Sequence, residues 1–333
     1  MQIVTFPPAL IEAYVADVKR LMQTGQVAES TYFREQGTAY VPNKLSIPVA
    51  SGGAGIFSLL AYHKHVSGRR LAIVQSNTMR ALYTVPRLLD MNVHVVDSTY
   101  DDFMSMSPDA LEHAFEDPQV RDSAVVLYSV IGGFLAPSFA RIAEQCRRAN
   151  VPLIVDGAHA HYLDAILGHS EVDIAYSFYA TKILPAGEGG LITTADRARH
   201  DWLRRFLMYD RFSNELQVGL NLRASELGSV LIHRLMTDPS VVTHFRDDRI
   251  SIANEYRAIC EKHGVRYLDP RGAADYNGYK FVILDPFEKV ERLGTGLTKH
   301  ARTSAVFDTD VLGRPTSLPH WCPPTYSSLI LRT

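Results

Sequence analysis

Short apolar segments alternate with longer amphipathic ones from about residue 45 to residue 196. The short segments have the length of strands, and the longer ones repeat apolar residues at helical spacing. Strands are predicted at 45–50, 71–74, 93–97, 124–130, 151–156, 172–178 and 190–196, and helices at 55–66, 79–91, 108–117 and 138–150. This alternation predicts an α/β fold, with a mostly parallel central sheet and crossover helices on both faces.

The pattern changes after residue 223. One long helical stretch is predicted over 224–263, and strand-like segments such as 279–284 follow it. A chain of 333 residues also exceeds the size at which a single hydrophobic core usually stops growing. We therefore expect a large domain over residues 1–235 and a small C-terminal α+β domain over residues 236–333.

Composition and charge mainly exclude classes of function and of partner. The hydrophobic fraction of 46% and the charged fraction of 21% are ordinary for a soluble globular protein. A formal net charge of −2 gives no electrostatic reason to expect nucleic acid or a membrane as partner. Neither a secretory leader nor a run of 18 apolar residues is found, so a cytoplasmic location is expected. Cys146, Cys260 and Cys322 lie far apart and indicate no disulfide framework.

Residues 154–193 carry the most informative chemistry. Asp156 ends one predicted strand, Ser177 ends the next, and Lys182 follows five residues later. In sheets of this kind, ligands bind beyond the carboxyl ends of the strands. Burial can lower the pKa of a lysine by several units, so that its amine can form a Schiff base. An aspartate facing the lysine would suit the pyridinium nitrogen of pyridoxal 5'-phosphate (PLP).

A phosphate site is predicted at residues 51–55, with the sequence SGGAG, between a strand and a helix. Glycines allow close approach of the backbone, and the N-terminus of a helix favours an anion. Ser177 could add a hydroxyl donor, and His159 could lie over one face of the cofactor ring. Together these residues indicate a PLP site.

Four motifs resemble the DegT/DnrJ/EryC1/StrS family of PLP-dependent aminotransferases of fold type I, many of which act on keto sugars or cyclitols. The motifs are DGAHAH at 156–161, SFYATK at 177–182, GEGG at 187–190 and GLNLR at 219–223. Their order and spacing extend the resemblance over about residues 50–270.

The resemblance implies roles for individual residues. Lys182 would hold PLP and then move a proton, Asp156 would pair with the pyridine nitrogen, and His159 would stack on the ring. The other implied cofactor-binding residues are Gly52, Gly53, Ala54, Met79, Ser177 and Asn221. Asn221 would reach the phosphate of a neighbouring subunit, because family members are dimers with shared sites.

Two positions depart from the family pattern. Gly53 stands where a threonine is usual, which removes one hydroxyl donor. Met79 stands where an aromatic residue often covers the ring, although a methionine can still pack on an aromatic system. The C-terminal part, which usually shapes the substrate pocket, is short for the family.

Other interpretations of these residues stay open. Lys182 could be an ordinary surface lysine, and Asp156 could be a turn residue. His159 and His161 could bind a metal with Asp156 and Asp164. No metal is expected, because PLP chemistry accounts for Asp156 and His159 together.

The glycine-rich segment after residue 51 could also suggest a dinucleotide site. Ser58 replaces the third glycine of that fingerprint, however, and Gln75 stands where an acidic residue is required. Asn221 and Arg223 could simply brace the helix that follows them.

The function expected from the residues and the resemblance is that of an aminotransferase. Glutamate or glutamine would convert PLP to its amino form (PMP), which would aminate a keto sugar, sugar nucleotide or cyclitol. The alternatives are a sugar dehydratase, another PLP enzyme of specialised metabolism, or a regulator without turnover. The presence of Lys182 and Asp156 argues against the dehydratase and the regulator.

Overall fold

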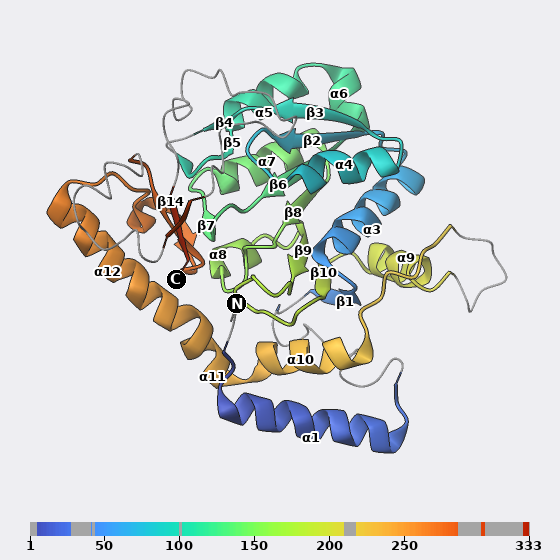
Figure 1. Ribbon diagram of the computed structural model, residues 1–333. Coiled ribbons are helices and arrows are strands. Elements are labelled where there is room, and N and C mark those ends of the chain that lie inside the picture. The colour runs from blue at the N-terminus through green and yellow to red at the C-terminus, as the bar shows by residue number, and fades with distance from the viewer. Residues whose placement is uncertain are drawn as a thin grey trace.

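The computed structural model describes residues 5–27, 41, 44–99, 102–209, 218–285, 301–303 and 329–332. A seven-stranded sheet forms its centre, in the order β1-β10-β9-β8-β6-β2-β3 (Figure 1). The strands are β1 (Leu45–Val49), β2 (Leu71–Gln75), β3 (Asn92–Val96), β6 (Ala124–Ser129), β8 (Leu153–Asp156), β9 (Asp173–Ser177) and β10 (Gly190–Thr194). Only β10 runs antiparallel to its neighbours, so the predicted mostly parallel sheet is confirmed.

Helices cover both faces of this sheet, as predicted (Figure 1). One face packs against α3 (Gly52–His65), α4 (Arg80–Leu88) and α9 (Arg197–Phe206). The other face packs against α5 (Pro108–Phe115), α7 (Phe139–Ala149), α8 (Asp164–Leu167) and α10 (Glu226–Thr237). The helices α1 (Pro8–Thr24) and α6 (Pro118–Ser123) lie further out.

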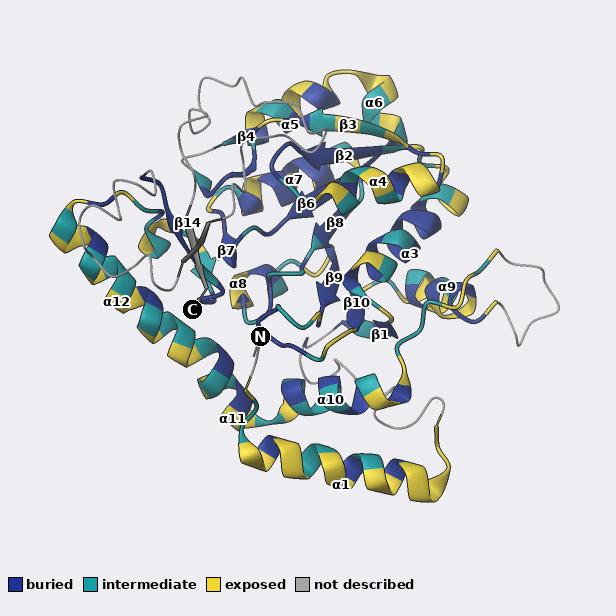
Figure 2. Ribbon diagram, viewed as in Figure 1, coloured by how far each residue is buried: buried dark blue, intermediate teal, exposed yellow. Residues whose placement is uncertain are grey.

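The two cores follow from the period-two geometry of the strands. In β6, Val125 and Leu127 belong to the core under α3, whereas Val126 and Tyr128 belong to the core under α7. Successive side chains of a strand point to opposite faces, so a strand covered on both sides must be apolar throughout. The continuous apolar runs in the sequence therefore become buried strands (Figure 2).

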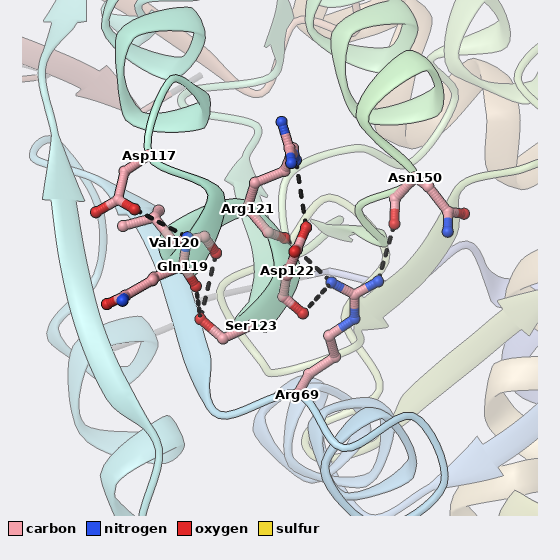
Figure 3. A network of polar contacts seen from close by, with 8 residues as sticks. All are labelled: Arg69, Asp117, Gln119, Val120, Arg121, Asp122, Ser123 and Asn150. Carbon is pink, nitrogen blue, oxygen red and sulfur yellow. Dashed lines mark hydrogen bonds and ion pairs between the residues drawn. The ribbon is translucent and has the colours of Figure 1, made fainter.

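A polar network joins the end of α3 to the opposite face of the sheet (Figure 3). The guanidinium of Arg69 donates to the carbonyl oxygens of Arg121 and Asp122 at 3.1 and 2.8 Å. It also donates to the carbonyl oxygen of Asn150, which ends α7 in a left-handed conformation, at 2.9 Å. These bonds tie the loop after α3 to the C-terminal ends of α6 and α7; the Arg121 carbonyl also accepts from the Ala124 amide that caps α6.

The single long helix expected over 224–263 is wrong. The chain forms α10, the short α11 (Pro239–Val242), a π-helical turn (Thr243–Asp247) and α12 (Asp248–His263). Asp238 breaks the helix because it precedes a proline and adopts an extended conformation, with ψ of 116°. Its carboxylate then caps α11 by accepting from the Ser240 amide at 2.9 Å.

The C-terminal part contains a second sheet, beside α12. Its three antiparallel strands are β12 (Lys280–Ile283), β14 (Leu329–Arg332) and β13 (Ala301–Thr303), and β12 lies within the predicted strand 279–284. The short pairs are β4 (Ser98–Thr99) with β5 (Ser105–Met106), and β7 (Phe134–Leu135) with β11 (Asp275–Tyr276). A 3-10 turn spans Pro270–Gly272. The domain division at residue 235 stays a prediction, and Cys322 lies outside the described residues.

Among the described helices, none combines the length and the apolar character needed to cross a membrane.

Candidate active site

The turn between β1 and α3 forms a backbone cradle at the carboxyl edge of the sheet. The side-chain oxygen of Ser51 begins the helix by accepting from the Ala54 amide at 3.1 Å. The Ala54 amide is therefore already bonded within the protein, and the contact of Ala54 with the cofactor stays a prediction. The first amides of a helix have no partner within it, so Gly52 and Gly53 stand where an anion is favoured.

Close packing explains why glycines occupy this cradle. A Cβ atom at Gly52 would lie 2.9 Å from the Cβ atom of Ser177, at the end of β9. A Cβ atom at Gly190 would lie 2.5 Å from the carbonyl carbon of Ser51. At Gly53 the nearest atom, Oγ of Ser51, would be 3.7 Å away, which is an ordinary contact, so packing does not require glycine there. Gly52 and Ser177 lie side by side, and the cradle suits a phosphate group; phosphate binding by Gly52, Gly53 and Ser177 stays a prediction.

Asp156 ends β8 next to this cradle and pairs in register with Ser129 of β6 and Ala175 of β9. One of its carboxylate oxygens, Oδ1, accepts from the Ala158 amide at 3.0 Å. Burial raises the pKa of Asp156, while the Ala158 amide and the Lys182 ammonium act in the opposite direction. A cation beside this carboxylate would stabilise its charged form against the cost of burial. This suits the predicted pairing with a pyridinium nitrogen.

Lys182 lies in the turn after β9, which closes with a hydrogen bond from its amide to the Tyr179 carbonyl at 2.8 Å. The lysine is only 9% exposed, and its Nζ lies 3.2 Å from Nε2 of His159. Burial lowers the pKa of Lys182, and the charge of Asp156 partly opposes that shift. A surface lysine would not be so buried, so the active-site interpretation gains support.

His159 is held between Lys182 and a backbone amide. Its Nδ1 accepts from the Gly132 amide at 3.3 Å. Burial lowers the pKa of His159 well below its usual value, and the charges of Lys182 and Lys280 add to the effect. His159 is thus neutral near pH 7. Its stacking on the cofactor stays a prediction.

His161 is packed among aromatic side chains and a backbone carbonyl. Its ring lies between Tyr176 and Phe178, with centroid distances of 5.1 and 4.8 Å, and its Nε2 lies 2.9 Å from the Ser177 carbonyl oxygen. Burial lowers the pKa of His161 to about 4. In the described part of the chain, no group of three or more His, Cys, Asp or Glu side chains is placed to hold a metal.

Met79 precedes α4 at the same edge of the sheet and is 57% exposed. The hydroxyl of its neighbour Thr78 bonds to the hydroxyl of Ser129, which faces Asp156 in register. Met79 is therefore near the site, and its contact with the cofactor ring stays a prediction.

Asn221 lies in a segment that runs beside β1 of its own chain. The Leu222 carbonyl accepts from the Ala50 amide at 2.7 Å, one residue before Ser51. The exposed Asn221 side chain accepts from Nε of Arg223 at 3.2 Å. Asn221 is thus at the surface near the cradle, and its action on a second subunit stays a prediction.

Two residues of the site were missed from the sequence. Asn277 donates to the carbonyl oxygens of His159 and His161, and Tyr279 packs its ring on His159 and donates to the Thr181 carbonyl. The asparagine-glycine pair at 277–278 signals a turn. Nothing local in the sequence connects that turn with residues about a hundred positions earlier.

Comparison with known proteins identifies the family to which this sequence is similar. The model of the DegT/DnrJ/EryC1/StrS aminotransferase family matches residues 8–320. A protein of Micromonospora echinospora is 32% identical over 215 residues, which are 61% of this chain and 46% of that protein. Its name assigns it, provisionally, as an L-glutamine:3-amino-2,3-dideoxy-scyllo-inosose aminotransferase. The matched part of this chain thus spans about half the length of that relative.

Solved structures share the fold. A DegT DnrJ EryC1 StrS aminotransferase from Brucella abortus superposes with a TM-score of 0.79 at 19% identity, covering 100% of this chain and 94% of that one. Helicobacter pylori PseC, an aminotransferase involved in the biosynthesis of pseudoaminic acid, gives 0.74 at 16% identity, covering 96% and 90%. The predicted fold type I architecture is confirmed.

Proposed function

This chain belongs to the DegT/DnrJ/EryC1/StrS aminotransferase family, and from that premise we propose that it moves an amino group from an amino acid to a keto sugar, sugar nucleotide or cyclitol. The family is PLP-dependent, as the sequence predicts. The observation that carries the proposal is the contact between the buried amine of Lys182 and the imidazole of His159, beside Asp156 and the glycine cradle. The name of the Micromonospora relative favours glutamine as the donor and a cyclitol ketone as the acceptor.

The residues present suit PLP as cofactor. When bound, PLP supplies an aldehyde that joins to amines and a ring that withdraws electrons from the carbon under attack. In our proposal the amides of Gly52 and Gly53 and the hydroxyl of Ser177 hold the phosphate. Asp156 holds a proton on the ring nitrogen, and His159 limits the access of water to one face.

Lys182 is the group proposed to move protons. Its lowered pKa leaves a larger share of free amine near neutral pH than an exposed lysine would have. The free amine can remove the Cα proton of the amino donor and return a proton on the acceptor side. Proton transfer by a positioned group of this kind accelerates a reaction by about 10²–10⁴-fold.

Transfer of labelled nitrogen tests the proposal. The PLP-loaded protein is incubated with glutamine labelled with ¹⁵N in its α-amino group and with a panel of keto cyclitols and keto-sugar nucleotides. We expect ¹⁵N in the amine product. Lys182→Ala should lose this transfer, whereas Lys262→Ala, which changes an exposed lysine of α12, should retain it.

The alternatives give different products. A dehydratase would release water from the sugar without gain of nitrogen. A regulator would bind the amino acid without releasing a keto acid. Either result with a PLP-loaded protein would refute the proposed transfer.

A homodimer with shared sites is part of the proposal. Large apolar side chains are exposed just before and within the Asn221 segment, at Tyr209, Val218 and Leu220. Exposed apolar residues that gather near a functional segment support a protein partner there, and we propose a second copy of this chain.

Complementation tests the sharing. Asn221→Ala and Lys182→Ala proteins are each inactive in this proposal. If Asn221 acts across the dimer, a mixed dimer regains one intact site and with it activity. If Asn221 acts within its own subunit, each site of the mixed dimer carries one change and mixing restores nothing.

The cytoplasmic location and the division at residue 235 belong to the same proposal. Cell fractionation tests the location. Limited proteolysis tests the division, with cleavage expected just after α10, at the break around Asp238.

A further inference from the structure

A segment of the C-terminal part returns to the active site. The short strand β11 pairs with β7, placing Tyr276 opposite Phe134 with stacked rings at 4.6 Å. Two residues from this segment, Asn277 and Tyr279, are buried against the loop that carries His159.

Asn277 fixes the backbone of that loop. Its side chain is 0% exposed, and its Nδ2 donates to the carbonyl oxygens of His159 and His161, at 2.8 Å each. Its Oδ1 accepts from the Tyr279 amide at 3.0 Å. A Cβ atom at Gly133, where φ is +86°, would overlap the Asn277 amide, so glycine is required there. The Asn277 amide group is therefore closely packed and fully hydrogen-bonded in one orientation.

Tyr279 contacts His159 directly and the residue that precedes Lys182. Its ring centroid lies 4.6 Å from that of His159, and its hydroxyl donates to the Thr181 carbonyl at 3.0 Å. Thr181 directly precedes Lys182. One side chain thus packs on the imidazole and anchors the turn that carries the amine.

The hydrogen bonds of His159 define where its proton lies. The Gly132 amide donates to Nδ1 at 3.3 Å, which leaves the proton of the neutral ring on Nε2; the Val130 carbonyl also acts on the ring, as an acceptor that competes for this proton. That Nε2 lies 3.2 Å from Nζ of Lys182. A free amine can accept this N–H because it has a lone pair, whereas an ammonium cannot. The arrangement favours the free amine.

We propose that Asn277 and Tyr279 are positioning residues: they hold His159 in the orientation in which its Nε2–H donates to the amine of Lys182, and so maintain the nucleophilic form of that amine. The meaning of this form for catalysis rests on the proposed function. The geometry does not, because it concerns residues of this chain alone.

The test measures how Lys182 itself titrates. Full-length, cofactor-free protein is treated with formaldehyde and cyanoborohydride over a pH series. Mass spectrometry of the peptide containing Lys182 then gives the midpoint pH of its modification. Tyr279→Phe keeps the ring on His159 and removes the bond to Thr181. Tyr276→Phe is the matched control, because its hydroxyl donates to a carbonyl of the same segment, that of Lys280, at 2.9 Å, and its ring stacks on Phe134.

We expect Tyr279→Phe to raise the midpoint by about 0.7 pH unit, if a hydrogen bond of ordinary strength acts fully on the balance between free amine and ammonium. At a fixed pH below the midpoint, the modification slows about fivefold. Tyr276→Phe should titrate like the wild type. Asn277→Ser should shift the midpoint in the same direction, by loss of the bonds that hold the His159 backbone.

A midpoint for Tyr279→Phe that matches the wild type, or lies below it, overturns the proposal. If Asn277→Ser fails to fold, the Tyr279→Phe result decides alone. The two proposals fail separately. A chain without aminotransferase activity whose Lys182 midpoint still shifts refutes only the function, and an active enzyme without the shift refutes only the positioning role.

Discussion

Replacing Asp173 by Asn removes a buried negative charge that several cations share. Asp173 is 2% exposed at the start of β9, and its Oδ2 accepts from the Arg199 guanidinium. Nε2 of His63 lies 3.8 Å away, beyond hydrogen-bonding distance. The charge also raises the pKa of Lys44, which burial lowers and whose Nζ donates to the Val172 carbonyl at 2.6 Å. The substitution keeps the shape of the side chain and removes the buried counter-charge that Asp173 provides to Arg199 and Lys44.

Removing one partner of a buried ion pair usually costs about 3–5 kcal/mol of folding free energy. Arg199 keeps a second carboxylate, since its Nη2 lies 3.5 Å from Asp196. We therefore take the lower end, about 3 kcal/mol. For a domain of roughly 150–250 residues, each kcal/mol lowers the melting temperature by about 2–4 °C, so Asp173→Asn should lower it by about 6–12 °C.

Thermal unfolding at pH 7, followed by circular dichroism, measures this difference. Asp201→Asn is the control, because Asp201 pairs with Arg197 at 3.2 Å on the exposed side of α9. Exposed pairs contribute about 0–1 kcal/mol, so the control should stay close to the wild type. An Asp173→Asn protein that melts together with the control would refute the argument that Asp173 compensates these buried cations.

Three other perturbations have definite outcomes. Because the folded-state pKa of His161 is about 4, the unfolded chain takes up a proton on this residue first as pH falls below about 6.5, and stability falls. His161→Phe should therefore reduce the slope of unfolding free energy against pH, measured by urea titration between pH 6 and 5, by about 1.2 kcal/mol per unit. Gly190→Ala should abolish retention of PLP on gel filtration, since its Cβ would meet the Ser51 backbone at 2.5 Å, whereas Gly168→Ala, with 3.5 Å of room, should bind PLP normally. Burial raises the pKa of Cys146 to about 12, so its peptide should stay unlabelled by iodoacetamide in the native protein and become labelled in urea.

The strands were predictable because their sequence signal is local. The strand expected at 71–74 forms β2, and the one at 124–130 forms β6, each within a residue of its predicted ends. The rule that parallel strands end at one edge of the sheet also predicts, from the sequence, that Asp156 and Ser177 lie in one region. The break at Asp238 was missed because the apolar repeat continues on both sides of it, and the repeat outweighed the local signal of the following proline.

Only some of the residues around Lys182 could be predicted from the sequence. The motifs identified Asp156 and His159, which lie near Lys182 in sequence. Asn277 and Tyr279 come from a segment about a hundred residues later, and their contacts exist only because β11 pairs with β7. A single sequence carries no local pattern for such a pairing, so the contacts of His159 could come only from the structure.

The buried charges around Asp173 and the glycine cradle lie at opposite ends of the same two elements. The helix α3 begins at Gly52, against Ser177 at the end of β9, and reaches His63, against Asp173 at the start of β9. The eleven helical steps between Gly52 and His63 span about 16 Å, and the four strand steps span about 13 Å. Helix and strand therefore lie against one another at both ends. At the charged end the link runs through Arg199, whose guanidinium pairs with Asp173 and lies over the ring of Tyr62 in α3, 5.1 Å from its centroid. Loosening the charged end lets α3 slide along β9, and the position of the cradle amides relative to the Ser177 hydroxyl depends on that alignment. Asp173→Asn should consequently weaken PLP binding at temperatures where the protein is still folded, and an unchanged PLP affinity would show that the cradle is fixed by its own contacts alone.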